Sequence, residues 1–262
     1  GWGQDGPLSH AAGHDPNYVA LTGALYHTGD EQYSPQSPPT LLGDAAGGAA
    51  MTALGICAGL IAALQKGKGQ VIDAAIGEGT SYLTTMVRSL YNVGQMTDER
   101  GKSWMEGAAP WSRAYICADG EFITLLPVEA RFYKTFLELM GLTEHAAFGD
   151  AHQYDASRWM EQCDVLEGIL ASEAREHWCE LLEGTDACFA PVMKYSDAHK
   201  HKHNQARGNF VEVDDDWYPI PAPKFSETPH TPDWGGLNPN AAVEPLRALG
   251  FDEDVVQLVT VR

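Results

Sequence analysis

Apolar and small residues recur at helical spacing over residues 44–65, where we expect a long helix. Along it Gly48, Thr52, Gly55 and Gly59 follow one another at intervals of four, three and four residues, so they share one helix face. Because these side chains are small, the face predicts close approach of another backbone segment. The length and composition make this stretch a weak transmembrane candidate and favour a buried helix.

After this helix, turn residues and a change in the spacing of apolar residues predict a strand and a second helix. The sequence GKGQ at residues 67–70 turns the chain into a strand over residues 71–76, and a second helix follows to about residue 92. Helix, strand and helix in this order indicate an α/β layer. Residues 94–112 show no clear period, so we expect a linker there.

A second group of elements begins at residue 113. Two β-prone runs flank Asp119 and Gly120, which predicts a hairpin. The elements expected after it are a helix that follows Glu129, helices over residues 157–171 and 173–182, a buried strand or loop over residues 185–192, and two short helices over residues 241–258. We therefore expect a small α+β domain over residues 113–195 and a proline-rich return segment over residues 196–262.

The balance of charged residues narrows the range of partners. The chain of 262 residues has 17 Lys and Arg residues against 36 Asp and Glu residues, a formal net charge of −19. Nucleic acids and anionic membranes attract basic surfaces, so we expect neither as a partner. The five cysteines are scattered and form no CxxC pair, which fits reduced, buried thiols in an intracellular, cytoplasmic protein.

Three residues are candidates for proton-transfer chemistry. His14, in the sequence GHDPNY, can take and give a proton near neutral pH. Asp44, in the sequence LLGD, stands at a predicted helix start, which keeps a carboxylate ionised. Each also has an ordinary explanation, namely helix capping for His14 and Asp44 and a first-turn acid for Glu129. The residue types alone leave both alternatives open.

The sequence HKHKH suggests a metal site at first sight. His199, His201 and His203 alternate, and on a strand they would present three possible zinc ligands on one face. Lys200 and Lys202 stand between them, and no further ligand set accompanies them. We therefore interpret the segment as a solvated helix end or loop and expect no metal.

Several blocks of the chain resemble the class III CoA-transferase (CaiB/BaiF) superfamily and occur in the family's order. They are GWGQDGP, GHDPNYVALTGAL, LLGDAAGGAAMTALGICAGLIAAL, GKGQVIDAAIGEGTSYL, GAAPWSRAYICADGEFITLLPVEARFY, GTDACFAPV and HKHNQARGNF. Together they cover nearly the whole chain. Within the superfamily they are most similar to the racemases that act on α-methylacyl-CoA thioesters.

This resemblance implies roles for the candidate residues. Asp44 matches the aspartate shared across the superfamily, which is a nucleophile in the transferases and an acid/base in the racemases. His14 and Glu129 match the pair that distinguishes the racemases, with His14 as the second acid/base and Glu129 as the group that holds it. The resemblance therefore favours racemisation by proton transfer at the α-carbon through an enolate.

Further residues would line the substrate site by the same resemblance; they are Asp15, Tyr18, Gly43 and Thr40. Thr40 departs from the family pattern, because the racemases often have Asn four residues before the catalytic aspartate. Backbone N–H groups of the helix that begins at Asp44 would serve as donors to the enolate oxygen.

The resemblance also implies the architecture. It predicts an α/β fold with a Rossmann-like large domain, of which residues 1–93 are the remaining, CoA-binding part, in an interlocked homodimer. Glu129 would then reach the site from the partner subunit. Family members have roughly a hundred more residues before GWGQDGP, so we expect a truncated chain. No cofactor is expected beyond the CoA of the substrate.

Two alternatives remain from the sequence. In the first, the protein is a CoA transferase that uses Asp44 as a nucleophile; His14 and Glu129 count against it, because a transferase does not need that pair. In the second, it is an inactive truncated relative whose role is assembly.

Overall fold

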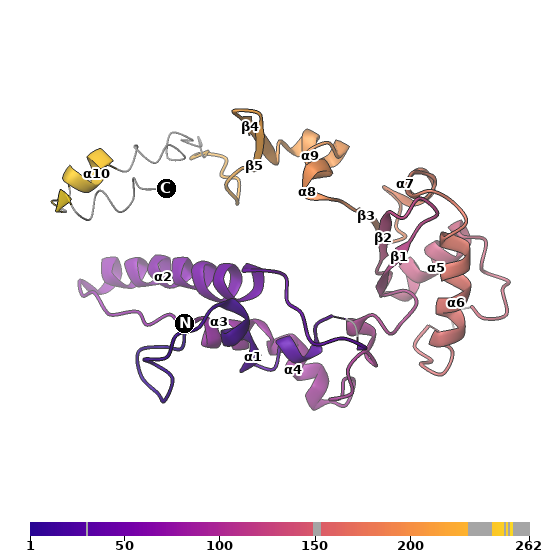
Figure 1. Ribbon diagram of the computed structural model, residues 1–262, viewed down its shortest axis with the longest axis horizontal. Coiled ribbons are helices and arrows are strands. Elements are labelled where there is room, and N and C mark those ends of the chain that lie inside the picture. Colours follow the sequence, from indigo (N-terminus) through magenta and orange to yellow (C-terminus); the bar gives the residue numbers. More distant parts are fainter. Residues whose placement is uncertain (30, 149–152, 230–242, 249, 251, 254–262) are drawn as a thin grey trace. The chain divides into compact units, whose positions relative to one another are not determined.

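The computed structural model describes residues 1–262 except 30, 149–152, 230–242, 249, 251 and 254–262 (Figure 1). The chain divides into two compact units, Gly1–Val192 and Met193–Arg262. The finer domain limits expected from the sequence stay predictions.

The first part of the larger unit, residues 1–112, contains no strands among its described residues but several helices. They are α1 (Asp15–Ala20), the 3-10 helix η1 (Leu25–His27), the π-helix η2 (Leu41–Ala50), α2 (Met51–Lys66), α3 (Ile76–Leu83), α4 (Thr85–Asn92) and the 3-10 helix η3 (Trp104–Glu106). α2 continues η2, so one long helix runs from Leu41 to Lys66. Its predicted start at Asp44 was wrong by three residues, because the Thr40 carbonyl already accepts the Ala45 N–H at 2.9 Å.

The glycines of the predicted face meet side chains, those of Ile72 and Ile76, and the close backbone approach lies next to that face at Gly47. A Cβ atom on Gly79 in α3 would overlap the carbonyl oxygen of Gly47 in η2. Farther along, Cβ atoms on Gly55 and Gly59 would lie 3.1 and 2.8 Å from the Ile72 side chain. The absence of side chains therefore lets α3 and the segment before it lie directly on the long helix.

The strand expected over residues 71–76 was wrong. Residues 71–75 have no regular secondary structure, and α3 begins at Ile76. Val71 is 96% exposed. A strand is stabilised by hydrogen bonds to a neighbouring strand, and among the described residues no strand pairs with this segment.

The opposite face of the long helix is exposed in the isolated chain. Leu54, Leu60 and Leu64 are each more than half exposed, so the expectation of a buried helix was wrong for this chain by itself. Among the described residues, Leu41–Lys66 is the one helix long and apolar enough to cross a membrane. Length and composition alone are weak evidence for a membrane span.

A three-stranded antiparallel sheet forms the second part of the larger unit. β1 (Arg113–Ile116) pairs with β2 (Phe122–Leu125) in the predicted hairpin, and Gly120 has φ 77° in its turn. β3 (Phe189–Val192) pairs with β2, so the predicted strand or loop over residues 185–192 is a strand in its second half.

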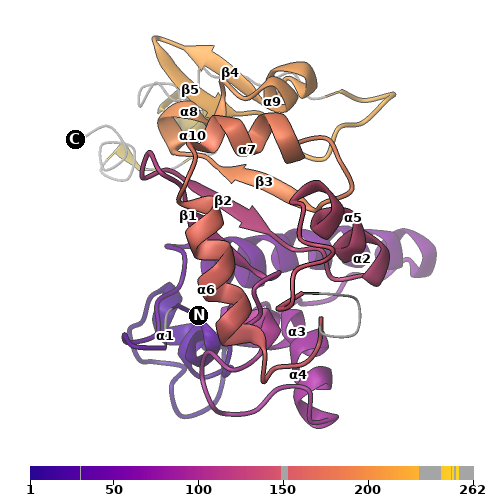
Figure 2. The ribbon, with the colours of Figure 1, turned by 90° about the vertical axis from the view of Figure 1, so that its right-hand side faces the viewer.

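Helices α5 (Ala130–Leu139), α6 (Trp159–Leu170) and α7 (Arg175–Leu182) accompany this sheet, close to the three predicted helices (Figure 2). Their apolar faces and the sheet enclose a core that includes Trp111, Tyr133, Phe136, Leu166 and Leu170, each fully buried. This core holds the start of α5, and with it Glu129, in place.

The smaller unit contains α8 (Tyr195–Ala198), α9 (Lys202–Arg207), β4 (Phe210–Val213), β5 (Asp216–Pro219) and α10 (Val243–Ala248). The β4–β5 hairpin was not predicted from the sequence. Its turn residues Asp214 and Asp215 have φ 51° and 68°, and Asp tolerates this left-handed conformation better than most residues. Of the two short helices expected over residues 241–258, α10 is one, and residues 254–258 lie outside the described residues.

Candidate functional site

His14 occupies the N-cap position of α1. Its backbone is extended, with φ −134° and ψ 176°, and its N–H donates to Oδ1 of Asn17 at 3.0 Å. The imidazole itself is on an exposed residue. The capping explanation therefore holds for His14, which forms a capping box with Asn17 at the start of α1.

Asp44 lies in the first turn of η2 and is exposed. This turn belongs to a π-helix of ten residues. π-helical turns are rare in proteins and occur frequently at functional sites. Asp44 is thus an acidic residue in the first turn of a π-helix. The N-cap residue of this helix is Thr40, not Asp44 as predicted.

Asp15 joins these two helix starts. Its Oδ2 atom accepts the N–H of Gly43 and the N–H of Asp44, each at 2.8 Å. The Asp15 residue is only 3% exposed. A carboxylate bonded to backbone N–H groups is held more firmly than a neutral acceptor would be. Asp15, next to His14 in sequence, therefore ties the start of α1 to the backbone at Asp44.

The same contact changes one expectation from the sequence. The N–H group of Asp44, the first of the helix donors that were expected to face an enolate oxygen, donates to Asp15 instead, as does the N–H group of Gly43. Gly43 is required for this approach, because a Cβ there would lie 2.6 Å from Oδ2 of Asp15. The N–H group of Asp44 is therefore not available as a donor to an enolate oxygen.

Tyr18 supports the loop that carries His14. Its hydroxyl donates to the Gly13 carbonyl at 2.5 Å. Its ring meets Trp2 edge to face, with centroids 4.6 Å apart. These contacts fix the backbone that leads into α1.

Thr40 has a strained backbone, with φ 57° in the left-handed region. A β-branched residue is a true outlier there, whereas Asn is among the residues that tolerate it. We expect Thr40→Asn to raise the free energy of unfolding by about 1 kcal/mol, because it removes part of this strain. Urea unfolding measures the change. Thr40→Val, which keeps the branch, should give no gain, and an equal gain from both would contradict the explanation.

Glu129 is the N-cap residue of α5 and is exposed. Its charge acts on two neighbours. Burial and then the Glu129 carboxylate raise the pKa of the Tyr154 hydroxyl, and the same two causes raise the pKa of the Cys188 thiol. Among the hydrogen bonds of the described residues, none joins Glu129 to His14. The structure therefore brings Asp15, next to His14 in sequence, into contact with the backbone of Asp44. No hydrogen bond or ion pair of the described residues joins the side chain of His14 or Glu129 to Asp44.

The HKHKH segment is partly ordered by packing. His199 stacks on Trp217, with ring centroids 4.3 Å apart, so it is not simply a solvated side chain as expected. His201 caps α9 by accepting the N–H of His203 at 3.3 Å. Within the described part of the chain, no group of three or more His, Cys, Asp or Glu side chains is arranged to hold a metal ion.

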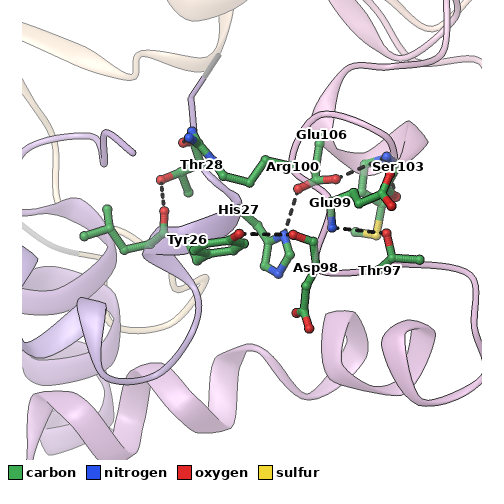
Figure 3. Close-up of polar contacts among 11 residues, drawn as sticks. Tyr26, His27, Thr28, Thr97, Asp98, Glu99, Arg100, Ser103 and Glu106 are labelled. Carbon is green, nitrogen blue, oxygen red and sulfur yellow. Dashed lines mark hydrogen bonds and ion pairs between the residues drawn. The ribbon is translucent and has the colours of Figure 1, made fainter. Parts of the chain in front are cut away.

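Sequence reasoning missed a histidine–carboxylate pair. Nδ1 of His27 in η1 lies 2.8 Å from Oε1 of Glu106 in η3 (Figure 3). The Glu106 side chain is 4% exposed and that of His27 is 18% exposed. These residues stand 79 positions apart, and neither belongs to a recognisable motif.

Comparison with known proteins decides the family. The profile of CoA-transferase family III matches residues 1–240. The chain belongs to CoA-transferase family III. It is 36% identical to alpha-methylacyl-CoA racemase of Mus musculus over 98% of this chain and 68% of the mouse protein. It is also 36% identical to alpha-methylacyl-CoA racemase of Homo sapiens, over 88% of this chain and 60% of the human protein.

A solved structure supports the fold. A CaiB/BaiF family protein from Brucella suis superposes with a TM-score of 0.70 at 19% sequence identity, over 92% of this chain and 66% of the other. The mixed α/β fold is thus the fold of the CaiB/BaiF proteins. The chain spans about two thirds or less of the length of these relatives.

Proposed function

We propose that the protein interconverts the two enantiomers of 2-methylacyl-CoA thioesters by moving a proton at the α-carbon. His14 and Asp44 act as the two acid/base groups. The contact of Asp15 with the Asp44 N–H carries this proposal, because it ties the helix that follows His14 to the helix that contains Asp44. The identity of 36% to mouse alpha-methylacyl-CoA racemase supports it.

The chemistry suits these residue types. The hydrogen next to a thioester carbonyl is weakly acidic, and its removal leaves a planar enolate. Inversion requires a base on one side of that plane and an acid on the other. A neutral imidazole and a carboxylate can take a proton in one direction and, once protonated, return it in the other.

Glu129 has a supporting role in the proposal. We expect it to hold and orient the His14 imidazole from the partner subunit of a homodimer. CoA enters as part of the substrate, and no other cofactor takes part in the proposed reaction. The proposal does not depend on whether the acyl group is aryl, branched or of another kind.

The second candidate is CoA transfer between carboxylic acids, which membership in CoA-transferase family III favours. Asp44 would then attack the thioester carbonyl, and CoA would pass to a second acid. The position of His14, directly before the Asp15 that bonds the Asp44 N–H, favours racemisation over this alternative.

One experiment separates the two reactions. The protein is incubated in D₂O with one enantiomer of a 2-methylacyl-CoA and an excess of a free carboxylic acid. Racemisation gives deuterium at the α-carbon, and transfer gives CoA on the added acid. CoA on the added acid without α-deuterium would replace the first proposal by the second.

Asp15 is expected to act as a positioning residue in this reaction. Asp15→Ala removes both hydrogen bonds from the turn that holds Asp44, and we expect a loss of about 3 kcal/mol of stability. We also expect kcat to fall more than KM rises, because the base is displaced while most substrate contacts remain. Asp15→Asn is the matched control, since its amide oxygen can still accept both N–H groups. Equal kcat values for both variants would contradict this role.

A further inference from the structure

The backbone that leads to Glu129 is held by two neighbouring side chains. Pro127 and Val128 lie between β2 and α5 and have no regular secondary structure. Nε2 of Gln153 donates to the Pro127 carbonyl at 3.0 Å and to the Val128 carbonyl at 2.9 Å. The Tyr154 hydroxyl donates to the same Val128 carbonyl at 2.7 Å. Three hydrogen bonds therefore fix the two peptide groups directly before Glu129.

Both donor residues are anchored in the core of the larger unit. Gln153 is only 2% exposed, and its backbone carbonyl accepts the indole N–H of Trp111 at 2.7 Å and that of Trp159 at 3.0 Å. The Trp111 ring also meets the Tyr154 ring edge to face, with centroids 5.1 Å apart. Trp111 is fully buried. The groups that hold the approach to Glu129 are therefore attached to the packed core.

The Glu129 side chain itself is left exposed. Glu129 is the N-cap residue of α5, but its side chain makes no capping hydrogen bond. Ser, Thr, Asp and Asn are preferred at this position, because their short side chains bond the N–H groups of the first turn. The structure shows no hydrogen bond or ion pair to the Glu129 carboxylate from any residue that it describes. A residue that breaks a local preference in this way is typical of a functional site.

We propose that Tyr154 and Gln153 are positioning residues for the α-proton transfer and that they act through Glu129. The inference rests on the proposed function, in which the Glu129 carboxylate orients the His14 imidazole. Such a contact requires the carboxylate to be placed to within about 0.5 Å. Loss of a donor to the Val128 carbonyl lets the adjoining Glu129 backbone shift, and the carboxylate moves with it.

The electrostatic surroundings keep the Tyr154 hydroxyl a donor. Burial and then the Glu129 carboxylate raise the pKa of Tyr154 above its usual value. An unperturbed tyrosine titrates near pH 10, so the phenol retains its proton throughout the neutral range. The hydrogen bond to Val128 is therefore present at every pH at which an imidazole and a carboxylate could exchange protons with the substrate.

Tyr154→Phe tests the proposal, because it removes the hydroxyl and keeps the ring that packs on Trp111. We expect kcat for α-deuterium exchange into a 2-methylacyl-CoA to fall about fivefold, the effect of one ordinary hydrogen bond, while KM stays unchanged. Gln153→Met removes both of its donors and should lower kcat about tenfold. Tyr195→Phe is the matched control, since Tyr195 in α8 is 96% exposed, and it should keep the parent kcat.

A second background separates positioning from support of the fold. If Tyr154 acts through Glu129, Tyr154→Phe should lower kcat by less than about twofold in a protein that already carries Glu129→Gln, because the charge that it positions is gone. If Tyr154 only supports the fold, the two effects are independent and the fivefold loss recurs in that background. Urea unfolding of the same samples shows whether each variant is folded.

Three results would overturn the inference and leave the proposed function in place. They are parent kcat in Tyr154→Phe, parent kcat in Glu129→Gln, and a loss from Tyr154→Phe that recurs undiminished beside Glu129→Gln. A parent protein that gives no α-deuterium exchange would instead reject the proposed function, and with it the role of both positioning residues.

Discussion

Replacing His14 with Ala or Asp44 with Asn is expected to lower the rate of racemisation by about 10²–10⁴-fold in each case. Each variant removes the acid/base on one side of the enolate, so a proton can no longer be exchanged on that side. The remaining base still removes the α-hydrogen of the enantiomer that presents it correctly. In D₂O the two variants should therefore exchange the α-hydrogen of opposite enantiomers, without inversion.

The control for this pair is His10→Ala, which changes an exposed histidine in the same N-terminal segment. It should racemise both enantiomers at the parent rate. The α-deuterium content of each enantiomer, followed by NMR together with chiral analysis, gives the answer. Exchange of the same enantiomer by both variants would show that His14 and Asp44 do not act on opposite sides.

Gly79→Ala is expected to have the largest effect on stability, about 3 kcal/mol or more. Its Cβ would overlap the backbone carbonyl oxygen of Gly47, and backbone cannot rotate away as a side chain can. α3 must then move off η2, which disturbs the helix that holds Asp44. Urea or thermal unfolding measures the loss, and the exchange rate should fall with it.

Gly77→Ala is the matched control in the same helix. A Cβ at Gly77 meets nothing within 4 Å, so the substitution gains helix propensity without a clash. We expect it to leave stability unchanged or to raise it by up to about 1 kcal/mol. Similar destabilisation by both substitutions would mean that helix propensity, not the contact with Gly47, determines the result.

The sequence predicted those features that are determined by residues close together in the chain. The small-residue spacing of the long helix predicted that one of its faces is closely approached, because periodicity places residues on one face. It did not identify the segment that approaches, and the close backbone contact with α3 lies at the neighbouring Gly47. The turn at Asp119 and Gly120 predicted the β1–β2 hairpin. His14 and Asp44 could be chosen because each lies in a distinctive motif.

The remaining features depend on contacts between distant residues. Asp15 reaches the Asp44 N–H across 29 positions, and His27 reaches Glu106 across 79. Patterns of neighbouring residues in the sequence do not predict contacts between residues so far apart. The strand expected over residues 71–76 failed for a related reason, since an apolar run becomes a strand only where a neighbouring strand pairs with it.

The most direct test of the central claim is the fate of the α-hydrogen. Each enantiomer of a 2-methylacyl-CoA is incubated separately with the protein in D₂O, and both configuration and α-deuterium are followed to equilibrium. The account predicts that both enantiomers reach the same mixture and that every inverted molecule carries α-deuterium. Retention of configuration and of the α-hydrogen by both enantiomers would contradict it.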